Sequence, residues 1–332
     1  MLIYFRSKGG KVYGWGNVVR MAHLAKYLKD HRGHKIIFFY EGDKDLKEFL
    51  NNFSFKKIRL KNNISYIEEK NLFKKFSKSR FFFLENLDTT FQLQKLYKSK
   101  SDKLVIFDDL LDKSYYSDYL ICAQERTMQM DISKDKNTKV YIGNKFFPFS
   151  QEILKKSIFE KKLEKNISTI MILLGGGNYE GAYIKIAKAL KGLKFKKISM
   201  VVGSSYSDDF VKFLKKINNK LILYKSLKNI GDAFSKHDIS IVSGGYTKFE
   251  AAVMKSPSLI ISTQWHQLDI AENFSKKTGC QHLGHFSKCK VLNIRKGIKK
   301  LGSFLVRKKI ISSYQKIVSK KGNEKVLEIL KI

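Results

Sequence analysis

Short apolar runs alternate with longer amphipathic stretches along the chain. Leu2–Arg6 and Lys35–Tyr40 have the length of buried strands, and Asn17–Lys29 between them repeats apolar residues at helical spacing. This alternation is typical of a parallel sheet covered by helices. The first half is expected to contain the strands Leu2–Arg6, Lys35–Tyr40, Lys103–Phe107, Asp118–Cys122 and Lys139–Ile142 and the helices Asn17–Lys29, Glu41–Phe53 and Thr89–Tyr97.

The alternation starts again after a highly charged stretch without strand character at residues 149–166. The second half is expected to contain the strands Ser168–Leu174, Lys197–Val202, Leu221–Tyr224, Ile239–Ser243 and Ser258–Ser262 and the helices Tyr183–Leu193, Asp208–Ile217, Asn229–Lys236, Thr247–Lys255 and Leu268–Lys277. We therefore predict an α/β protein with two Rossmann-like domains that face a cleft. The expected boundaries are 1–148 for the first domain, 149–166 for a linker and 167–332 for the second domain.

Composition agrees with two folded domains. The chain has 332 residues, 43% of them hydrophobic, and only two prolines, which excludes a disordered or collagen-like chain. Its three cysteines, Cys122, Cys280 and Cys289, are too few and too scattered for a disulfide framework or a zinc site, so we expect buried reduced thiols. No signal peptide and no 18-residue apolar run is recognisable, and we expect a cytoplasmic protein.

The formal net charge of +35 raises nucleic acid as a partner, but the kind of cation argues against it. Only eight of the 65 basic residues are arginine, the residue favoured for bidentate recognition of phosphates and bases. The lysines are spread along nearly the whole chain. We therefore expect no specific nucleic-acid partner, whereas loose attraction to an anionic membrane surface needs no defined geometry.

Three glycine-containing turns follow expected strands, at the edge where open α/β sheets bind ligands. The first contains Gly14 and Gly16 and enters a helix, but it matches neither a P-loop nor a dinucleotide fingerprint, and a plain tight turn also explains it. The second has three consecutive glycines, Gly175, Gly176 and Gly177. That is more than a turn needs, which favours close approach of a ligand to the backbone.

The third turn is Ser243-Gly244-Gly245, followed by a helix expected to begin near Thr247. The two glycines leave the start of this helix open to a diphosphate. Glu250 lies three residues into the helix, where a carboxylate can accept two hydrogen bonds from a ribose diol. Its spacing from Thr247 also fits a capping box, and the two roles are compatible.

The histidines are less informative, because none has the spacing of metal ligands. His266 lies between an expected strand and an expected helix, so it is either a site residue or an ordinary surface residue. His282 and His285 are expected in a loop. We predict neither a metal nor a cofactor.

Further short segments occur in a fixed order along almost the whole chain. They are Phe5-Arg6-Ser7, Gly14-Trp15-Gly16-Asn17-Val18-Val19-Arg20, Phe107-Asp108-Asp109 with Ser117–Ile121, Tyr141–Gly143 with Phe147–Phe149, Leu174–Gly177, Val202–Ser205, Ser243–Glu250 and Gln267–Asn273. Together they resemble the PseG/SpsG group of nucleotide-sugar enzymes, which have the GT-B architecture and are related to the MurG glycosyltransferases.

This resemblance implies that the second domain binds the UDP of a UDP-sugar. The uracil would lie near Lys197–Val202, the diphosphate at Gly244–Gly245, and Glu250 would bind the ribose, while the sugar projects towards the first glycine loop. Arg6, Arg20, His266 and Gln267 complete the implied substrate-binding set.

The family's Gly-x-Gly-His motif has Asn17 in place of histidine. In the pseudaminic-acid branch that histidine assists water in displacing UDP from a 2,4-diacetamido-trideoxy sugar, but asparagine neither takes nor releases a proton near neutral pH. Asn17 therefore either orients an acceptor hydroxyl or caps its helix. Asp108, Asp109 and His23 are alternative bases, although His23 is expected to face away from Asn17.

The leading prediction is an enzyme that cleaves the sugar–phosphate bond of a UDP-sugar and passes the glycosyl group to a sugar or lipid-linked acceptor. Such an activity belongs to bacterial surface-glycan synthesis of the nonulosonic-acid type. Three alternatives remain open: the UDP-sugar hydrolase of pseudaminic acid synthesis, a non-catalytic nucleotide-sugar binding protein, and an electrostatic nucleic-acid binder. UDP release, its dependence on an acceptor and the salt dependence of binding distinguish them.

Overall fold

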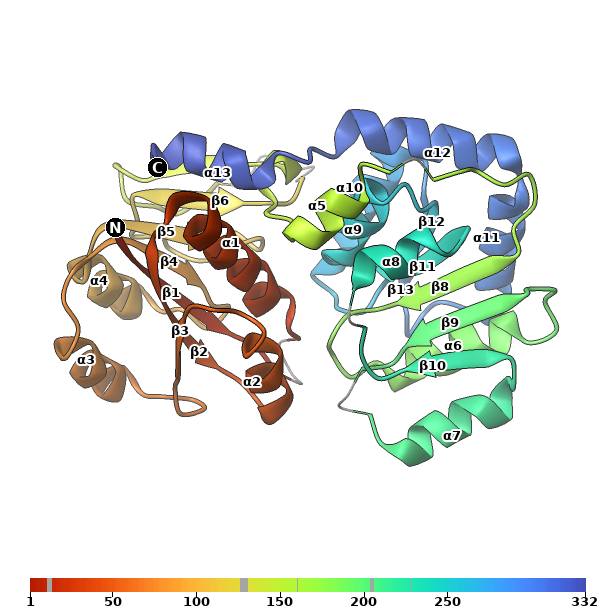
Figure 1. Cartoon of the computed structure of the whole chain (residues 1–332), viewed down its shortest axis with the longest axis horizontal. Helices are drawn as coiled ribbons and strands as arrows, with labels where there is room; N and C mark the ends of the chain where they lie inside the picture. The colour runs from red at the N-terminus through yellow and green to blue at the C-terminus, as the bar shows by residue number, and fades with distance from the viewer. Residues whose placement is uncertain (11–13, 126–130, 160, 204–205, 228) are drawn as a thin grey trace. The chain divides into compact units, whose positions relative to one another are not determined.

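The chain forms two units, each built on its own parallel sheet (Figure 1). The computed structural model describes residues 1–10, 14–125, 131–159, 161–203, 206–227 and 229–332. The first unit comprises Met1–Ser150 and Lys321–Ile332, and the second comprises Gln151–Lys320.

The sheet of the first unit has seven strands among the described residues, in the order β3-β2-β1-β4-β5-β6-β7. They are β1 (Leu2–Lys8), β2 (Lys35–Glu41), β3 (Lys56–Arg59), β4 (Ser79–Glu85), β5 (Ser101–Phe107), β6 (Tyr119–Cys122) and β7 (Lys139–Ile142). The helices of this unit are α1 (Gly16–Arg32), α2 (Lys44–Leu50), α3 (Tyr66–Lys74), α4 (Phe91–Ser99) and α13 (Gly322–Leu330), with a 3-10 turn η1 at Asn144–Phe146.

Aromatic side chains fill both faces of this sheet. Phe5 stacks on Phe38 and Phe83 of the neighbouring strands, with ring centroids 5.7 and 4.7 Å apart. Tyr4 points to the opposite face, where its ring meets those of Phe39 and Phe82 edge to face. Successive residues of a strand point to opposite faces, so a parallel strand that is buried on both sides reads as a continuous apolar run.

The C-terminal helix α13 packs in the first unit, although the predicted boundaries assign it to the second domain. Its residues Val326, Leu327 and Leu330 are buried in the same core as Phe5 and the α1 residue Met21. Figure 1 shows α13, in blue, with the elements of the first unit. An apolar stripe that fits this core outweighs the closeness of α13 in sequence to the second unit.

The second sheet has six strands among the described residues, in the order β10-β9-β8-β11-β12-β13. They are β8 (Thr169–Leu173), β9 (Lys197–Val201), β10 (Leu221–Tyr224), β11 (Ile239–Ser243), β12 (Ser258–Ser262) and β13 (Gln281–His285). The helices are α5 (Gln151–Lys156), α6 (Glu180–Leu190), α7 (Asp208–Ile217), α8 (Ile230–Ser235), α9 (Thr247–Val253), α10 (Gln267–Thr278), α11 (Val291–Gly302) and α12 (Phe304–Ile317).

The structure confirms the α/β class and every strand that the sequence predicts. One expectation about the strands is wrong: His282 and His285 lie in β13 and not in a loop. This strand pairs with β12 irregularly and contains Gly284 at a φ of 77°, which interrupts the apolar alternation by which a strand is recognised.

Candidate functional site

Each sheet reverses its strand order at one point, and the glycine turns lie at these points. In the second sheet β8 is flanked by β9 and β11, and in the first sheet β1 is flanked by β2 and β4. Where the order reverses, the helices that follow the two strands leave on opposite sides of the sheet and open a crevice at the carboxyl ends of the strands. The geometry of each unit therefore makes these turns candidate ligand sites.

In the turn after β8, local structure alone explains two of the three glycines. Gly175 has a φ of 92°, a conformation that side chains with a Cβ rarely adopt. At Gly177 a Cβ would lie 2.2 Å from the hydroxyl of Tyr179, and the Gly177 carbonyl accepts a 3.0 Å hydrogen bond from Tyr206. Gly176, between them, is partly exposed.

The turn after β11 contains a buried cation that sequence reasoning missed. The side chain of Lys248 is buried, and its Nζ donates hydrogen bonds of 2.8 Å to the carbonyls of both Gly244 and Gly245. The Ser243 and Thr247 hydroxyls are hydrogen-bonded to each other at 2.8 Å. The turn is thereby held in one shape with a positive charge against it, which favours an anion at this edge.

Glu250 lies one turn into α9, and among the described residues its carboxylate has no hydrogen-bond or ion-pair partner. Burial raises its pKa to about 7. The capping-box interpretation is wrong, because the N-cap is Tyr246, no side chain caps the helix, and the Thr247 hydroxyl is turned back to Ser243. A partly buried carboxylate without a partner is suited to receive hydroxyl donors from a ligand.

The turn after β12 adds an amide. The Gln267 Oε1 accepts hydrogen bonds from the backbone N–H and the hydroxyl of Thr263, at 3.0 and 3.2 Å. Its Nε2 would lie only 3.3 Å from a Cβ placed on Gly245, so the amide N–H₂ group is directed at the turn after β11. His266 is the N-cap of α10 and is exposed, and the exposed Trp265 ring stacks on His285 with centroids 4.0 Å apart.

In the first unit, the turn after β1 closes on itself. Gly10 and Gly14 exchange two backbone hydrogen bonds of 3.0 and 2.7 Å, and α1 then begins at Gly16. The N-cap is Trp15, without a side-chain cap, so Asn17 is the second residue of the helix. The prediction that Asn17 caps α1 is therefore wrong.

Arg20, expected to contact substrate, is buried among carboxylates. Its Nε donates to Glu85 Oε2 at 3.1 Å, its Nη2 donates to Glu85 Oε1, and its Nη1 donates to Asp109 Oδ2 at 3.1 Å. The guanidinium also lies over the ring of Phe107, 5.3 Å from its centroid. Asp109 in turn accepts a 2.8 Å hydrogen bond from the backbone N–H of Ala123.

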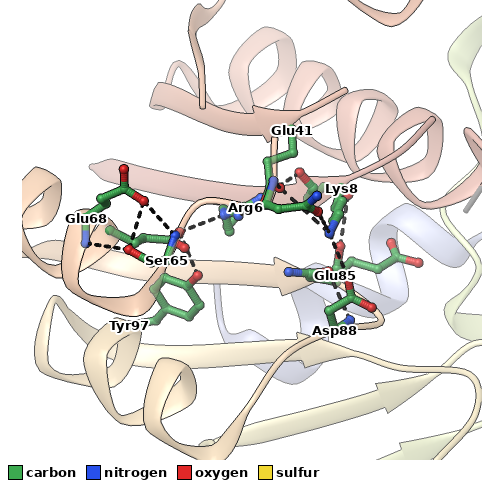
Figure 2. Close-up of polar contacts among 12 residues, drawn as sticks. Arg6, Lys8, Glu41, Ser65, Glu68, Glu85, Asp88 and Tyr97 are labelled. Carbon is green, nitrogen blue, oxygen red and sulfur yellow. Dashed lines mark hydrogen bonds and ion pairs between the residues drawn. The ribbon is translucent and has the colours of Figure 1, made fainter. Parts of the chain in front are cut away.

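Arg6 forms a second buried cluster at the same edge of the sheet (Figure 2). Its guanidinium donates to Glu69 at 2.8 Å and to Glu41, and Tyr97 donates to the same Glu69 oxygen at 2.7 Å. Lys8, two residues further along β1, pairs with Asp88 at 2.7 Å. Buried charges persist when they are paired in this way, and the pairing ties the ends of β1 and β2 to α3 and to the segment after β4.

Two of the alternative bases have structural contacts of their own. Asp108 is buried, and its oxygens accept hydrogen bonds from the backbone N–H of Leu110 at 2.8 Å and from Lys113 at 2.9 Å. His23 packs its ring against Phe49 and Phe53. Ser204 and Ser205, which belong to the resemblance motif after β9, lie outside the described residues.

The described residues contain no group of three or more His, Cys, Asp or Glu side chains arranged to hold a metal ion. Cys122, Cys280 and Cys289 are free and buried. In the part of the chain that the structure describes, no helix has the length and apolar character needed to cross a membrane.

Two α/β units, each built on a parallel sheet, define the GT-B fold. Solved glycosyltransferases share this fold along almost their entire length. MurG of Acinetobacter baumannii superimposes with a TM-score of 0.61 at 10% sequence identity, covering 99% of both chains. TcCGT1, crystallised in complex with UDP, superimposes with a TM-score of 0.67 at 10% identity, covering 99% of this chain and 98% of its own.

In sequence, the chain is similar to the spore coat polysaccharide biosynthesis protein SpsG of Bacillus subtilis. The two are 26% identical over 289 residues, which cover 84% of this chain and 82% of SpsG. The uncharacterized protein MJ1062 of Methanocaldococcus jannaschii is 25% identical over 296 residues, or 85% of this chain, and the match spans only 60% of that archaeal protein. No protein-family model matches the chain.

Proposed function

We propose that this protein is an SpsG-like enzyme that cleaves the sugar–phosphate bond of a UDP-sugar and transfers the glycosyl group to a sugar or lipid-linked acceptor. Its place would be the synthesis of surface polysaccharide of the nonulosonic-acid type. The observation that carries the proposal is the Glu250 carboxylate, which has no partner among the described residues and lies in the first turn of the helix that follows Gly244–Gly245, at the strand-order reversal of the second sheet.

UDP would be bound by the second unit alone. We place the ribose diol at Glu250, the diphosphate at Ser243, Gly244 and Gly245 with Thr247 behind them, and the uracil near the end of β9. Two features of the site support this arrangement: the buried Lys248 ammonium lies against the turn, and the Gln267 amide is directed at it. The relationship to SpsG and the UDP in the TcCGT1 structure support the same assignment.

The sugar would be bound by the first unit, at the turn that contains Gly14 and Gly16. We propose that Arg6 and Arg20 shape this side of the site indirectly, because both guanidinium groups are buried and occupied by carboxylates. Gly175, Gly176 and Gly177, together with His266, would be further substrate-binding residues of the second unit.

Transfer is favoured over hydrolysis by the residues near Asn17. An amide cannot activate water as a base, and Asp108 and Asp109 are each held by a cation and a backbone N–H. Both carboxylates are thus engaged in contacts that hold the local structure. We therefore assign Asn17 to orienting an acceptor hydroxyl, with Asp108 and Asp109 as residues that order its surroundings.

The nucleotide assignment is tested by calorimetry and thermal shift with UDP-, GDP- and CMP-sugars. We expect UDP compounds alone to raise the melting temperature. Glu250→Ala removes a charged acceptor for two hydroxyls and should weaken UDP binding roughly 10- to 150-fold. Glu328→Ala, in an exposed i,i+3 pair with Lys325 in the first unit, is the matched control and should bind UDP normally. Equal UDP affinity in wild type and Glu250→Ala would remove Glu250 from the ribose role.

A further inference from the structure

A cavity of about 320 Å³ lies at the opposite edge of the second sheet from the proposed nucleotide site. Its walls come from the segments that precede β8, β11 and β12, and so from the amino ends of these strands. The helix α5 packs against α8 and α9 beside it. The strands separate this cavity from the turns that carry Gly176 and Gly244, so the two sites do not share residues.

Lysine dominates the lining. The described residues contribute five lysines, which are Lys156, Lys161, Lys162, Lys236 and Lys255. Lys156 is paired with Asp232 at 2.6 Å, and Lys162 lies 3.6 Å from Glu164. Among the described residues, the ammonium groups of Lys236 and Lys255 have neither a hydrogen bond nor an ion pair.

Lys161 lies at the base of the cavity. Its Nζ donates a 3.0 Å hydrogen bond to the carbonyl of Phe234 and another to the carbonyl of His237, which leaves one N–H unassigned. Burial lowers the pKa of Lys161 to about 8, although the charge of Asp238 acts in the opposite direction. An anion in the cavity would stabilise the charged form of this lysine.

The two acidic residues that the structure describes in the lining, Asp238 and Glu164, are directed to other partners. One Asp238 oxygen accepts hydrogen bonds from the backbone N–H groups of Ser168 and Thr169, at 2.7 and 2.8 Å, and from both of their hydroxyls. That carboxylate is turned to the start of β8. Glu164 is exposed and lies beside Lys162.

The backbone of Lys255 points to the same conclusion. Lys255 has a φ of 52°, directly after α9, a position where helices usually place glycine or asparagine. A side chain in this left-handed conformation is strained. The half-buried side chain of Lys255 lines the cavity wall. Glycine at this position would avoid the strain but would place no ammonium group there.

We propose that this cavity is a binding site for a phosphate group, held by Lys236, Lys255 and Lys161. Its volume is at the small end of the range for ligand pockets, about 300–1,000 Å³, which fits a phosphate or a small phosphomonoester better than a nucleic-acid backbone. Ammonium groups bind phosphate as point charges, and a pocket with several of them and little compensating acid is suited to a dianion. Phosphate in solution and the headgroup of an anionic lipid present the same chemistry.

Lys255→Gly is the decisive variant, because glycine suits the backbone at this position and removes only the side chain. Lys331 provides a matched control: it is also a lysine after a helix at positive φ, 55°, but it lies in the first unit. Calorimetry at constant ionic strength would compare inorganic phosphate binding by wild type, Lys255→Gly, Lys236→Ala and Lys331→Gly. We expect wild type and Lys331→Gly to bind alike, and each cavity variant to bind roughly tenfold or more weakly.

Vesicles of phosphatidate in phosphatidylcholine distinguish the sources of the phosphate. If the wild type binds these vesicles, Lys255→Gly does not, and inorganic phosphate displaces them, the site is supported and a lipid headgroup supplies the phosphate. If the protein binds inorganic phosphate but not the vesicles, the site is supported and its ligand is a soluble phosphate. Equal effects of Lys255→Gly and Lys331→Gly, or no phosphate binding by the wild type, would overturn the proposal and leave only the general basic charge of the chain.

Discussion

Arg20 in α1 holds both carboxylate oxygens of Glu85, the last residue of β4, and reaches Asp109 with its remaining terminal nitrogen. Both side chains of the Arg20–Glu85 pair are almost fully buried. The helix that carries Asn17 is thereby tied to the carboxyl end of the first sheet. The position of Asn17, three residues before Arg20 in the same helix, therefore depends on a pair whose other member, Glu85, is remote in sequence.

Replacing Arg20 by methionine should destabilise the first unit by about 3–5 kcal/mol, because Glu85 and Asp109 would remain as buried charges without their cation. Urea unfolding at pH 7 measures the change. Arg80→Met is the control, since Arg80 pairs with Asp102 on the surface and its loss should cost less than about 1 kcal/mol. Similar effects of the two variants would contradict the structural weight given to Arg20.

The raised pKa of Glu250 predicts a pH dependence of stability. Between pH 4.5 and about 7 the folded state keeps a proton that the unfolded state has released, so the free energy of unfolding falls as the pH rises through this window. Glu250→Gln has no group that titrates at this position. Its free energy of unfolding should therefore exceed that of the wild type by up to roughly 3 kcal/mol at pH 8. The two proteins should be equally stable near pH 4.5. If the free energies of unfolding of the two proteins, measured with denaturant, change with pH in the same way, the raised pKa of Glu250 is excluded.

We propose that Asn17 determines which reaction the site favours. Positioned acid–base catalysis supplies about 10²–10⁴-fold, so the wild type should release UDP from its sugar mainly when an acceptor is present. Asn17→His should raise the release that needs no acceptor. A coupled UDP-release assay with and without acceptor lipid extract measures both. Fast release by the wild type without acceptor would refute transfer and favour the hydrolase.

Gly244 should tolerate no side chain, for a reason of space. A Cβ there would lie 2.8 Å from the Ser262 hydroxyl and 3.1 Å from the Cβ atoms of Ala271 and Gln267. Gly244→Ala should therefore cost about 1–3 kcal/mol and weaken UDP binding. Gly302→Ala, at the end of α11 with open space around its Cα, should be neutral or slightly stabilising. Thermal unfolding and calorimetry of both variants test the contrast.

The fold was predictable because many of its strands are short apolar runs, such as residues 36–40 in β2. The strand β3 was not, because Lys56–Arg59 at the sheet edge contains only one apolar residue, and the stretch around β4 has no clear period. Candidate turns follow from glycine and strand order. The role of Lys248 does not, because a lysine in an amphipathic stretch predicts an exposed side chain, and only the folded turn shows its Nζ on two carbonyls.

The packing of α13 into the first unit has a consequence for synthesis on the ribosome. The first unit buries Val326, Leu327 and Leu330, which are translated after every residue of the second unit. The second unit can therefore complete its core while the first still exposes the apolar surface that these three residues will cover. During that interval the first unit, although it is synthesised first, is the last to complete its fold. It is therefore the unit most in need of protection from aggregation.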